Sequence, residues 1–459
     1  MRTDTIAAIA TGMSNSGIGI VRISGDQAFE VIDRIYRDKN EHPKNISQSK
    51  SHTAHYGYIY DENEKIDEAL VLIMKGPHSY TGEDTVEIDC HGGILMVKKI
   101  LESVIRHGAR TAEPGEFTKR AFLNGRMDLS QAEAVADIIE ATNEYALKAS
   151  VNQLSGSVSR KIRELRAGIL YEIAFIESAL DDPEHISLEG YEERLMKSLL
   201  PMIGEVEDLI RSADDGRIMT EGVKTVILGK PNAGKSSLMN VLLGEDRAIV
   251  TEIAGTTRDT LEEHIYLQGI SLNVVDTAGI RDTEDVVEKI GVDRAMKAAR
   301  DADLIIYVVD GSCPLDESDY EIMDFIHNRK AIVLLNKSDL QLVVEKDQLE
   351  QLSGRRVISV SAKKEQGIEE LEQEIKSLFY HGELSFNDQV YITNVRHKEA
   401  LEQALESLTM VKKSLEDKMP EDFYSIDLMN AYEQLGFIIG EEVDDDLVNE
   451  IFSKFCMGK

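Results

Sequence analysis

A glycine-rich stretch near the middle of the chain has the residue types and spacing to bind phosphate. Residues 229–236 read GKPNAGKS and fit the phosphate-loop pattern G-x-x-x-x-G-K-[ST]. The glycines let backbone N–H groups turn toward phosphate oxygens, Lys235 can reach the β- and γ-phosphates, and Ser236 offers a hydroxyl to magnesium. A glycine-rich turn without a ligand is the alternative. We predict a nucleotide site, because an apolar run at 226–228 precedes the loop and a helix-like segment follows it.

Three further motifs indicate that the nucleotide is GTP. DTAG at 276–279 follows a predicted strand and is typical of a magnesium-side carboxylate with a glycine that senses the γ-phosphate. NKSD at 336–339 ends in an aspartate that can accept two hydrogen bonds from guanine, which adenine cannot supply. SAK at 361–363 follows another strand and offers a backbone N–H to the guanine oxygen. In this order, at the carboxyl ends of predicted strands, the motifs predict a GTPase related to the translation factors.

Length, charge and cysteine content limit the class of protein. The 459 residues allow about three domains. The 84 acidic and 51 basic residues give a net charge of −33, which argues against a broad basic surface but leaves room for a local basic patch that holds RNA. The three cysteines are too widely spaced for a disulfide framework or a zinc cluster. Without a signal sequence or an apolar run near 18 residues, we expect a soluble, cytoplasmic protein with no membrane partner.

The predicted elements divide the chain into four segments. Residues 1–119 mix short strands and helices, 120–215 and 381–459 carry amphipathic helices, and 216–380 carries the nucleotide motifs. A capping box, in which the Ser130 hydroxyl caps and Glu133 reaches back, predicts the start of one helix. We predict one split helical domain with the GTPase inserted, because each half alone has little against which to bury its apolar face. Two separate helical bundles are the alternative.

Several stretches resemble the MnmE (TrmE) family of tRNA modification GTPases. They are VRISG (21–25), GPHSYTGED (76–84), EFTKRAFLNGRMDLSQAEA (116–134), the GTPase motifs and the terminal FCMGK (455–459). The resemblance covers essentially the whole chain. It implies a multidomain α/β protein: an α+β tetrahydrofolate-binding domain (1–119) that dimerises, a split all-α domain (120–215 and 381–459) and an inserted Ras-like phosphate-loop GTPase domain (216–380). Gly12, where the family usually has proline, and Met457, where isoleucine is usual, depart from the pattern.

The resemblance also implies a function. It predicts a potassium-dependent GTP hydrolase that binds a folate one-carbon carrier, a 5-formyl- or methylene-tetrahydrofolate. With an FAD-containing MnmG (GidA) partner in a heterotetramer, such a protein places a carboxymethylaminomethyl-type group on carbon 5 of the wobble uridine in certain tRNAs. One alternative is a ribosome-assembly GTPase of the Era or EngA group, although the C-terminal stretch has neither the basic face nor the GxxG loop of a KH domain. A dimer in which GTP only tunes assembly is another.

The residues expected to act on GTP follow from the motifs and the resemblance. Ras-like GTPases orient the attacking water with a glutamine, but the corresponding residue here is Ile280, and the resemblance assigns this catalytic role to Glu288. Without the resemblance, Glu288 reads as a solvated helix charge, and Asn232 as a residue that caps its turn. The predicted potassium ligands are Asn232 and the carbonyls of Thr251, Ile253 and Thr256, and the magnesium ligands are Ser236 and Thr257. The predicted GTP contacts are Asn232, Ala233, Gly234, Lys235, Ser236, Ser237, Thr251, Glu252, Ile253, Ala254, Gly255, Thr256, Thr257, Asp276, Thr277, Ala278, Gly279, Asn336, Lys337, Asp339, Ser361 and Ala362.

Four charged residues match the family's folate contacts: Arg22, Glu87, Arg126 and Lys459. A carboxylate such as Glu87 can accept two hydrogen bonds from the amino-pyrimidinone edge of a pteridine. The two arginines suit the carboxylates or carbonyls of the glutamyl tail. In the final helix-like stretch, Leu447, Ile451 and Phe455 are spaced to dock the tail, which would carry Lys459 toward the folate. Cys456 is a possible nucleophile or a buried tail thiol, and His91 reads as a structural histidine rather than a base.

Overall fold

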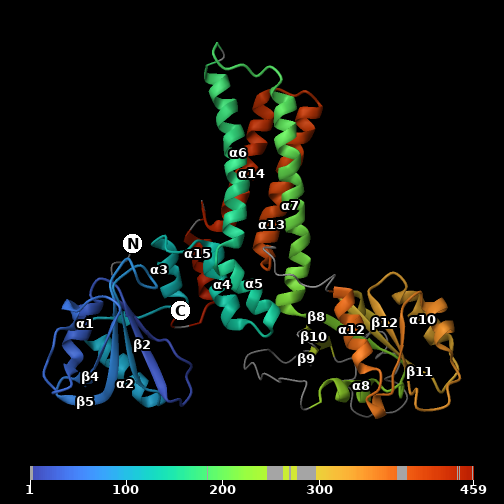
Figure 1. Cartoon of the computed structure of the whole chain (residues 1–459), viewed down its shortest axis with the longest axis horizontal. Coiled ribbons are helices and arrows are strands. Elements are labelled where there is room, and N and C mark those ends of the chain that lie inside the picture. Colours follow the sequence, from blue (N-terminus) through green and yellow to red (C-terminus); the bar gives the residue numbers. More distant parts are fainter. Residues whose placement is uncertain are drawn as a thin grey trace. The chain divides into compact units, whose positions relative to one another are not determined.

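The computed structural model describes residues 4–182, 184–244, 262–267, 270–275, 296–379, 390–441, 443, 445–456 and 458. They form two compact units (Figure 1). The first unit comprises Met1–Glu140, Ser150–Val206 and Glu399–Lys459, and the second comprises Ala141–Ala149 and Glu207–Lys398. Within the described residues, no helix is both long and apolar enough to cross a membrane.

A seven-stranded sheet in the order β3-β4-β5-β6-β2-β1-β7 forms the N-terminal part of the first unit. Neighbouring strands are antiparallel except β1 and β7. Alternate residues of β2 and β6, such as Val21 and Ile88, are buried with α1 and α2, which cover one face (Figure 1). Because strand side chains alternate, Arg22 and Glu87 lie on the opposite face. The elements are β1 (Ile6–Ile9), β2 (Ile18–Ser24), α1 (Ala28–Ile35), β3 (Tyr36–Asp38), the 3₁₀ helix η1 (Ile46–Gln48), β4 (Thr53–Asp61), β5 (Glu64–Met74), β6 (Thr85–His91), α2 (Ile94–Arg106), β7 (Arg110–Thr111) and α3 (Glu116–Leu123).

Helices from both ends of the chain pack together in the same unit. Helix α6 lies along α14 (Figure 1), and α3 contacts α15. Between α6 and α14, the buried Arg166 guanidinium donates to the Tyr432 carbonyl, lies over the Tyr432 ring and pairs with Glu441. The all-α part is therefore split in sequence, as predicted. The predicted limits of the four segments remain a proposal. The helices are α4 (Leu129–Glu140), α5 (Glu144–Leu154), α6 (Ser157–Asp181), α7 (Tyr191–Glu221), α13 (Val395–Glu416), α14 (Glu421–Ile439) and α15 (Asp445–Ser453). The start of α5, the C-terminal half of α7 and the start of α13 belong to the second unit.

Helix α4 begins differently from the prediction. Asp128, not Ser130, caps the helix: the Gln131 N–H donates to Asp128 Oδ1, and the Asp128 N–H donates to Gln131 Oε1, both at 3.1 Å. Ser130 lies inside the helix, where its hydroxyl donates to the same carboxylate at 2.6 Å. The predicted capping box was wrong because Asp-Leu-Ser-Gln satisfies the same geometric rule two residues earlier, with a charged acceptor at its first position.

The second unit has helices on both faces of a six-stranded sheet in the order β13-β12-β11-β8-β10-β9 (Figure 1). Only β9 pairs in antiparallel fashion within this described sheet. One core lies between the sheet and α8 and α12, and a second lies on the face that α10 and α11 cover. The elements are β8 (Val223–Leu228), α8 (Lys235–Leu242), β9 (Glu262–Leu267), β10 (Ile270–Val275), β11 (Leu304–Asp310), α10 (Glu317–Ile326), β12 (Ala331–Asn336), α11 (Lys346–Ser353), β13 (Val357–Ser359), η2 (Ala362–Lys364) and α12 (Ile368–Phe379).

A buried polar chain joins β11, α10 and the phosphate loop. The Tyr307 hydroxyl donates to Asp319 Oδ1 at 2.6 Å, and Lys230 Nζ lies 2.6 Å from Asp319 Oδ2. Tyr307 and Asp319 are almost fully buried. Asp316 caps α10 in a reciprocal capping box with Asp319 and also pairs with Lys230 at 2.8 Å. The position of Lys230 at the start of the phosphate loop therefore depends on the capped end of α10.

We predict that Tyr307→Phe lowers the free energy of unfolding of the second unit by about 1–2 kcal/mol, because one oxygen of the buried Asp319 loses its donor. Native-state hydrogen exchange of the β11 amides measures the change. Tyr320→Phe is the matched control, since the Tyr320 side chain is 48% exposed, and it should change stability by less than about 0.5 kcal/mol. Equal effects of the two substitutions would contradict the structural role of the Tyr307 hydroxyl.

Candidate functional site

The predicted phosphate loop connects β8 to α8, and the Asn336 side chain holds it through a hydrogen bond. Asn336 is 3% exposed, its Nδ2 donates to the Ala233 carbonyl at 2.8 Å, and its Oδ1 accepts from the Ala362 N–H at 3.2 Å. One side chain thus ties the phosphate loop to the 361–363 loop. Gly234 has φ +101°, and a Cβ there would lie 2.1 Å from Asn336 Nδ2. Glycine is required at this position by both the backbone angle and the close approach.

Lys235 and the first turn of α8 form the phosphate end of the site. Lys235 Nζ donates to the carbonyls of Gly229 and Lys230 at 2.7 and 2.9 Å, and burial lowers its pKa. Helix α8 begins with Ser236 and Ser237 in its first turn, and no described side chain caps it. Its first N–H groups have no capping side chain among the described residues and can donate to a phosphate.

Asn232 occupies the left-handed region, with φ +59°, and is exposed. Its side chain makes no hydrogen bond to any residue in the described ranges, so the turn-capping alternative finds no support there. The side-chain oxygen is available to a cation.

The opposite end of the site presents an ionised aspartate. The Ser361 hydroxyl donates to Asp339 Oδ1 at 2.7 Å and holds the pKa of Asp339 below its usual range. Lys337 pairs with Asp310 at 2.6 Å. Burial alone would raise the pKa of Asp310, but the contacts with Lys337 and Ser312 outweigh it, and the pKa lies below its usual value. The structure therefore brings together the predicted residues Asn232, Ala233, Gly234, Lys235, Ser236, Ser237, Asn336, Lys337, Asp339, Ser361 and Ala362 at one edge of the sheet.

The other predicted residues of this site lie outside the described residues. They are Thr251, Glu252, Ile253, Ala254, Gly255, Thr256, Thr257, Asp276, Thr277, Ala278, Gly279 and Glu288. Their assignments stay predictions.

In the first unit, two of the predicted folate residues, both arginines, lie over one aromatic ring, and a third pairs with one of them. Arg22 Nε donates to Glu87 Oε1 at 2.8 Å, and its guanidinium lies 5.2 Å from the Tyr80 ring centroid. Arg126 lies 5.8 Å from the same centroid and donates to the Ser79 carbonyl at 2.8 Å. Burial raises the pKa of Tyr80. The sequence analysis did not single out Tyr80, although it lies within the GPHSYTGED stretch that carries the resemblance.

The C-terminal segment reaches this group of residues. The Gly458 carbonyl accepts from Arg22 Nη1 at 3.4 Å, and a Cβ on Gly458 would lie 2.3 Å from the Ile9 carbonyl oxygen. The Gly115 N–H donates to the Cys456 carbonyl, and a Cβ on Gly115 would lie 2.4 Å from the Phe452 oxygen. Two close approaches at glycine thus fix the tail. Lys459 itself lies outside the described residues.

The C-terminal stretch docks partly as predicted. Phe455 is buried, and Ile451 is half-buried and packs against the same core, whereas Leu447 is not part of it. Val448 and Phe452, one position along from the predicted residues, are the most buried side chains of α15, because the spacing of apolar residues in this short helix fits two adjacent stripes.

The remaining candidates differ in environment. Cys456 is exposed, so its reading as a buried tail thiol was wrong. His91 is exposed and its Nδ1 lies 2.8 Å from Asp67 Oδ1, which raises the His91 pKa. Cys90 is buried, and burial raises the pKa of its thiol to about 12.

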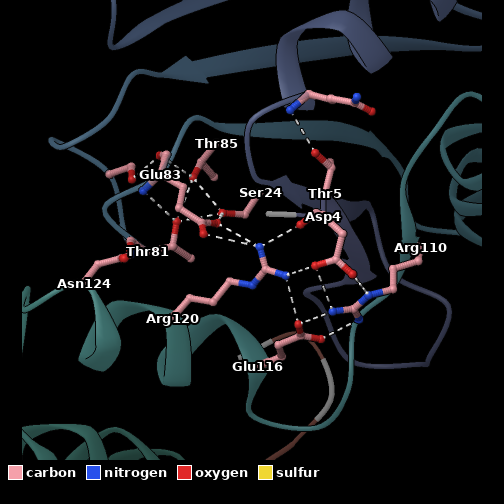
Figure 2. Close-up of polar contacts among 12 residues, drawn as sticks. Asp4, Thr5, Ser24, Thr81, Glu83, Thr85, Arg110, Glu116, Arg120 and Asn124 are labelled. Carbon is pink, nitrogen blue, oxygen red and sulfur yellow. Dashed lines mark hydrogen bonds and ion pairs between the residues drawn. The ribbon is translucent and has the colours of Figure 1, made fainter. Parts of the chain in front are cut away.

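A buried ionic network connects α3 to the segment before β1 and to Glu83 (Figure 2). The Arg120 guanidinium, 8% exposed, pairs with Asp4, Glu83 and Glu116 at 3.0–3.2 Å. Arg110 pairs with both Asp4 and Glu116 at 2.5 Å. The Glu83 carboxylate also accepts from the hydroxyl of Ser24, two residues after Arg22 on β2. The network therefore connects α3, β2 and the segment before β1. The sequence showed these residues only as scattered charges.

Comparison with known proteins decides the family. Residues 129–456 match the model of the MnmE helical domain, and residues 5–126 match that of the GTP-binding protein TrmE N-terminus. A tRNA modification GTPase MnmE from Lachnoclostridium phytofermentans is 60% identical over 100% of both chains. One from Clostridioides difficile is 48% identical over 99% of both.

The chain belongs to the MnmE family of tRNA modification GTPases. The predicted fold class is confirmed: a TrmE-type N-terminal domain, an MnmE helical domain and a Ras-like phosphate-loop GTPase. The full-length match to MnmE proteins excludes the alternative of an Era- or EngA-type protein. A solved structure of Aquifex aeolicus Era covers only 41% of this chain and 67% of its own, with 26% identity and a TM-score of 0.27, a score too low to support an argument.

We predict that Gly234→Ala lowers the affinity for GDP at least tenfold, because the added carbon would displace Asn336 and with it the phosphate loop. Titration with a fluorescent GDP analogue measures the affinity. Gly244→Ala, just after α8, is the control: its Cβ would meet only the Val241 oxygen, at 3.4 Å, and it should bind as the unmodified chain does. Normal binding by Gly234→Ala would show that Asn336 does not hold the loop.

Proposed function

We propose that this tRNA modification GTPase requires potassium and magnesium, binds a 5-formyl- or methylene-tetrahydrofolate, and acts with an FAD-containing partner. In this proposal the two proteins, as a heterotetramer, modify carbon 5 of the wobble uridine in certain tRNAs with a carboxymethylaminomethyl-type group. The observation that carries the proposal is that Arg22, which pairs with Glu87, and Arg126 both lie over the Tyr80 ring, in the same chain as a phosphate loop joined to the NKSD and SAK motifs by Asn336. A cytoplasmic location remains a prediction.

The GTPase half of the proposal assigns each cation its ligands. Asn232 and the carbonyls of Thr251, Ile253 and Thr256 hold potassium, while Ser236 and Thr257 hold magnesium. When bound, potassium supplies the positive charge that an arginine finger supplies in other GTPases. The exposed Asn232 side chain at φ +59°, with no hydrogen bond in the described ranges, supports its role as a ligand. Glu288 orients the attacking water, since an isoleucine follows DTAG.

The folate half of the proposal rests on charge and shape around Tyr80. Glu87 accepts hydrogen bonds from the amino-pyrimidinone edge of the pteridine. These bonds replace part of its present contact with Arg22. Arg22 and Arg126 hold the glutamyl tail, and Lys459 joins them from the C-terminus. The contact between Gly458 and Arg22 supports this placement, because it brings the adjacent residue to the same group of charges. Cys456, which is exposed, is a possible nucleophile in the same place.

We further propose a homodimer through the N-terminal domain. The sheet face that carries Arg22 and Glu87 also carries Ile18, Tyr56 and Leu70, whose side chains are 62%, 47% and 46% exposed. Asp89, opposite Leu70 on the same face, has a buried Oδ1 with no partner among the described residues. An apolar face with an unsatisfied carboxylate is typical of a surface that another chain covers.

We predict that GTP hydrolysis rises more than tenfold, on the order of 1.4 kcal/mol, when potassium replaces sodium. Asn232→Ala should remove most of this difference because the side-chain ligand is lost. Phosphate release at equal ionic strength measures the rate. Asn240→Ala, on the exposed side of α8, is the control and should keep the full potassium response. Equal rates in the two salts would contradict the proposed potassium requirement.

We predict that Gly458→Ala weakens folate binding at least tenfold and abolishes tRNA modification, while potassium-dependent GTP hydrolysis stays within twofold. The reason is that a Cβ would clash with the Ile9 carbonyl and lift the tail from Arg22. Calorimetric titration with 5-formyl-tetrahydrofolate and mass analysis of wobble nucleosides from complemented cells are the measurements.

The matched control is Gly93→Ala, where a Cβ would meet only the Met96 side chain, at 3.9 Å. It should leave both readouts unchanged. Unchanged folate affinity in Gly458→Ala would remove the tail from the folate site and return it to the status of a frayed end.

A further inference from the structure

Lys230, the second residue of the phosphate loop, holds its ammonium group against helix α10. Its Nζ lies 2.8 Å from Asp316 Oδ2 and 2.6 Å from Asp319 Oδ2. Burial alone would lower the pKa of Lys230, but the contacts with the two carboxylates outweigh it and raise the pKa. One ammonium between two carboxylates leaves no surplus positive charge to attract a phosphate. Although it is a lysine of the phosphate loop, Lys230 is therefore not suited to be a phosphate ligand.

The two carboxylates that hold Lys230 are themselves fixed. Asp319 is 1% exposed, its Oδ1 accepts from the Tyr307 hydroxyl at 2.6 Å, and its Oδ2 accepts from the Asp316 N–H at 3.0 Å. Asp316 Oδ1 accepts from the N–H groups in the first turn of α10, which leaves its Oδ2 for Lys230. Neither carboxylate can shift without losing these bonds, so the contact with α10 fixes the position of Lys230.

The main chain of Lys230 connects α10 to the lysine that reaches the nucleotide. The Lys230 carbonyl accepts from Lys235 Nζ at 2.9 Å and from the Ala233 N–H at 3.3 Å. An ammonium group has three donors, and the carbonyls of Gly229 and Lys230 take two of those of Lys235. The direction of the third donor depends on where these two carbonyls lie. A displaced Lys230 would therefore misdirect Lys235.

Other contacts hold the loop on either side of Lys230. A Cβ on Gly229 would lie 2.4 Å from the Val308 carbonyl oxygen, so the preceding residue closely approaches β11. Asn336 holds the Ala233 carbonyl further along the loop. Lys230 adds an attachment to α10 between these two. A loop that is held before the nucleotide binds loses less conformational freedom on binding.

We propose that Lys230 is a positioning residue for GTP binding and hydrolysis: held by α10, it fixes the carbonyl that orients the Lys235 ammonium toward the β- and γ-phosphates. The proposal rests on the GTPase activity of the MnmE family. It uses neither the proposed cation sites nor the proposed folate site. It gives α10, which carries no nucleotide motif, a part in the GTPase site.

The experiment compares the affinities of GDP and GMP for the full-length chain, each measured by competition with a fluorescent GDP analogue at one magnesium concentration. GMP lacks the β-phosphate that Lys235 reaches, so an effect of positioning should appear with GDP and be nearly absent with GMP. Lys230→Gln should weaken GDP binding about tenfold, weaken GMP binding less than about twofold, and lower kcat for GTP hydrolysis about tenfold. Lys230→Arg keeps the charge and can donate to both carboxylates, so its GDP affinity should lie within about threefold of that of the unmodified chain.

A second variant and a matched control accompany these two. Asp316→Asn keeps a good N-cap for α10, but it replaces the oxygen that faces Lys230 with an amide donor. It should weaken GDP binding about threefold and leave GMP binding unchanged. Lys224→Gln removes the same charge from the exposed side of β8, and it should change neither affinity.

The outcomes decide between positioning and a purely structural role. A loss that is selective for GDP in Lys230→Gln and is restored in Lys230→Arg supports the inference. The inference is overturned if GDP affinity is unchanged, if GDP and GMP affinities fall by the same factor, if Lys230→Arg binds GDP as weakly as Lys230→Gln, or if Lys224→Gln has the same effect. Should Lys230→Gln fail to fold, the ratio of GDP to GMP affinity in Asp316→Asn decides: a lower ratio supports the inference and an unchanged ratio overturns it. A missing potassium effect or missing folate binding would contradict the proposed function and leave this result as it stands.

Discussion

The close approach of a remote segment to the backbone at a few glycines is the constraint on which both candidate sites depend. At Gly234 the neighbour is the Asn336 amide, at Gly115 it is the Phe452 carbonyl, and at Gly458 it is the Ile9 carbonyl. In each case a single added carbon would come within 2.4 Å of a polar atom that lies far away in sequence. These contacts carry no binding energy of their own. They set the distances over which the stronger interactions, such as the Arg22–Glu87 pair, can operate.

Buried polar networks provide the complementary restraint. Arg120 connects α3 to the segment before β1 and to Glu83, and the Lys230–Asp319–Tyr307 chain connects the phosphate loop to α10 and β11. Each network is nearly saturated within the described residues, so its members are occupied in positioning rather than in binding.

Much of the fold class and of the nucleotide site could be predicted from local sequence. The phosphate loop, the NKSD motif and the SAK motif depend on short segments whose residue types must be present whatever the surroundings, and the strands before them are continuous apolar runs. Predictions were less accurate where the sequence pattern fits two neighbouring positions equally well. Both Asp128 and Ser130 satisfy the rule for a helix cap, and two adjacent stripes of α15 could face the core. Only the packing of the whole unit chooses between such solutions.

The sequence alone determined the chemistry of the GTP site and, through its resemblance, the family, because those features reside in contiguous motifs. It also placed Arg22, Glu87 and Arg126 on a list of folate residues without any reason for them to meet. Tertiary structure decided that Arg22 and Arg126 lie over the Tyr80 ring, that Glu87 pairs with Arg22, and that Gly458 reaches Arg22 from a segment remote in sequence. The physical reason is that burial and distance between remote segments arise only when the segments pack, and no local pattern encodes either quantity.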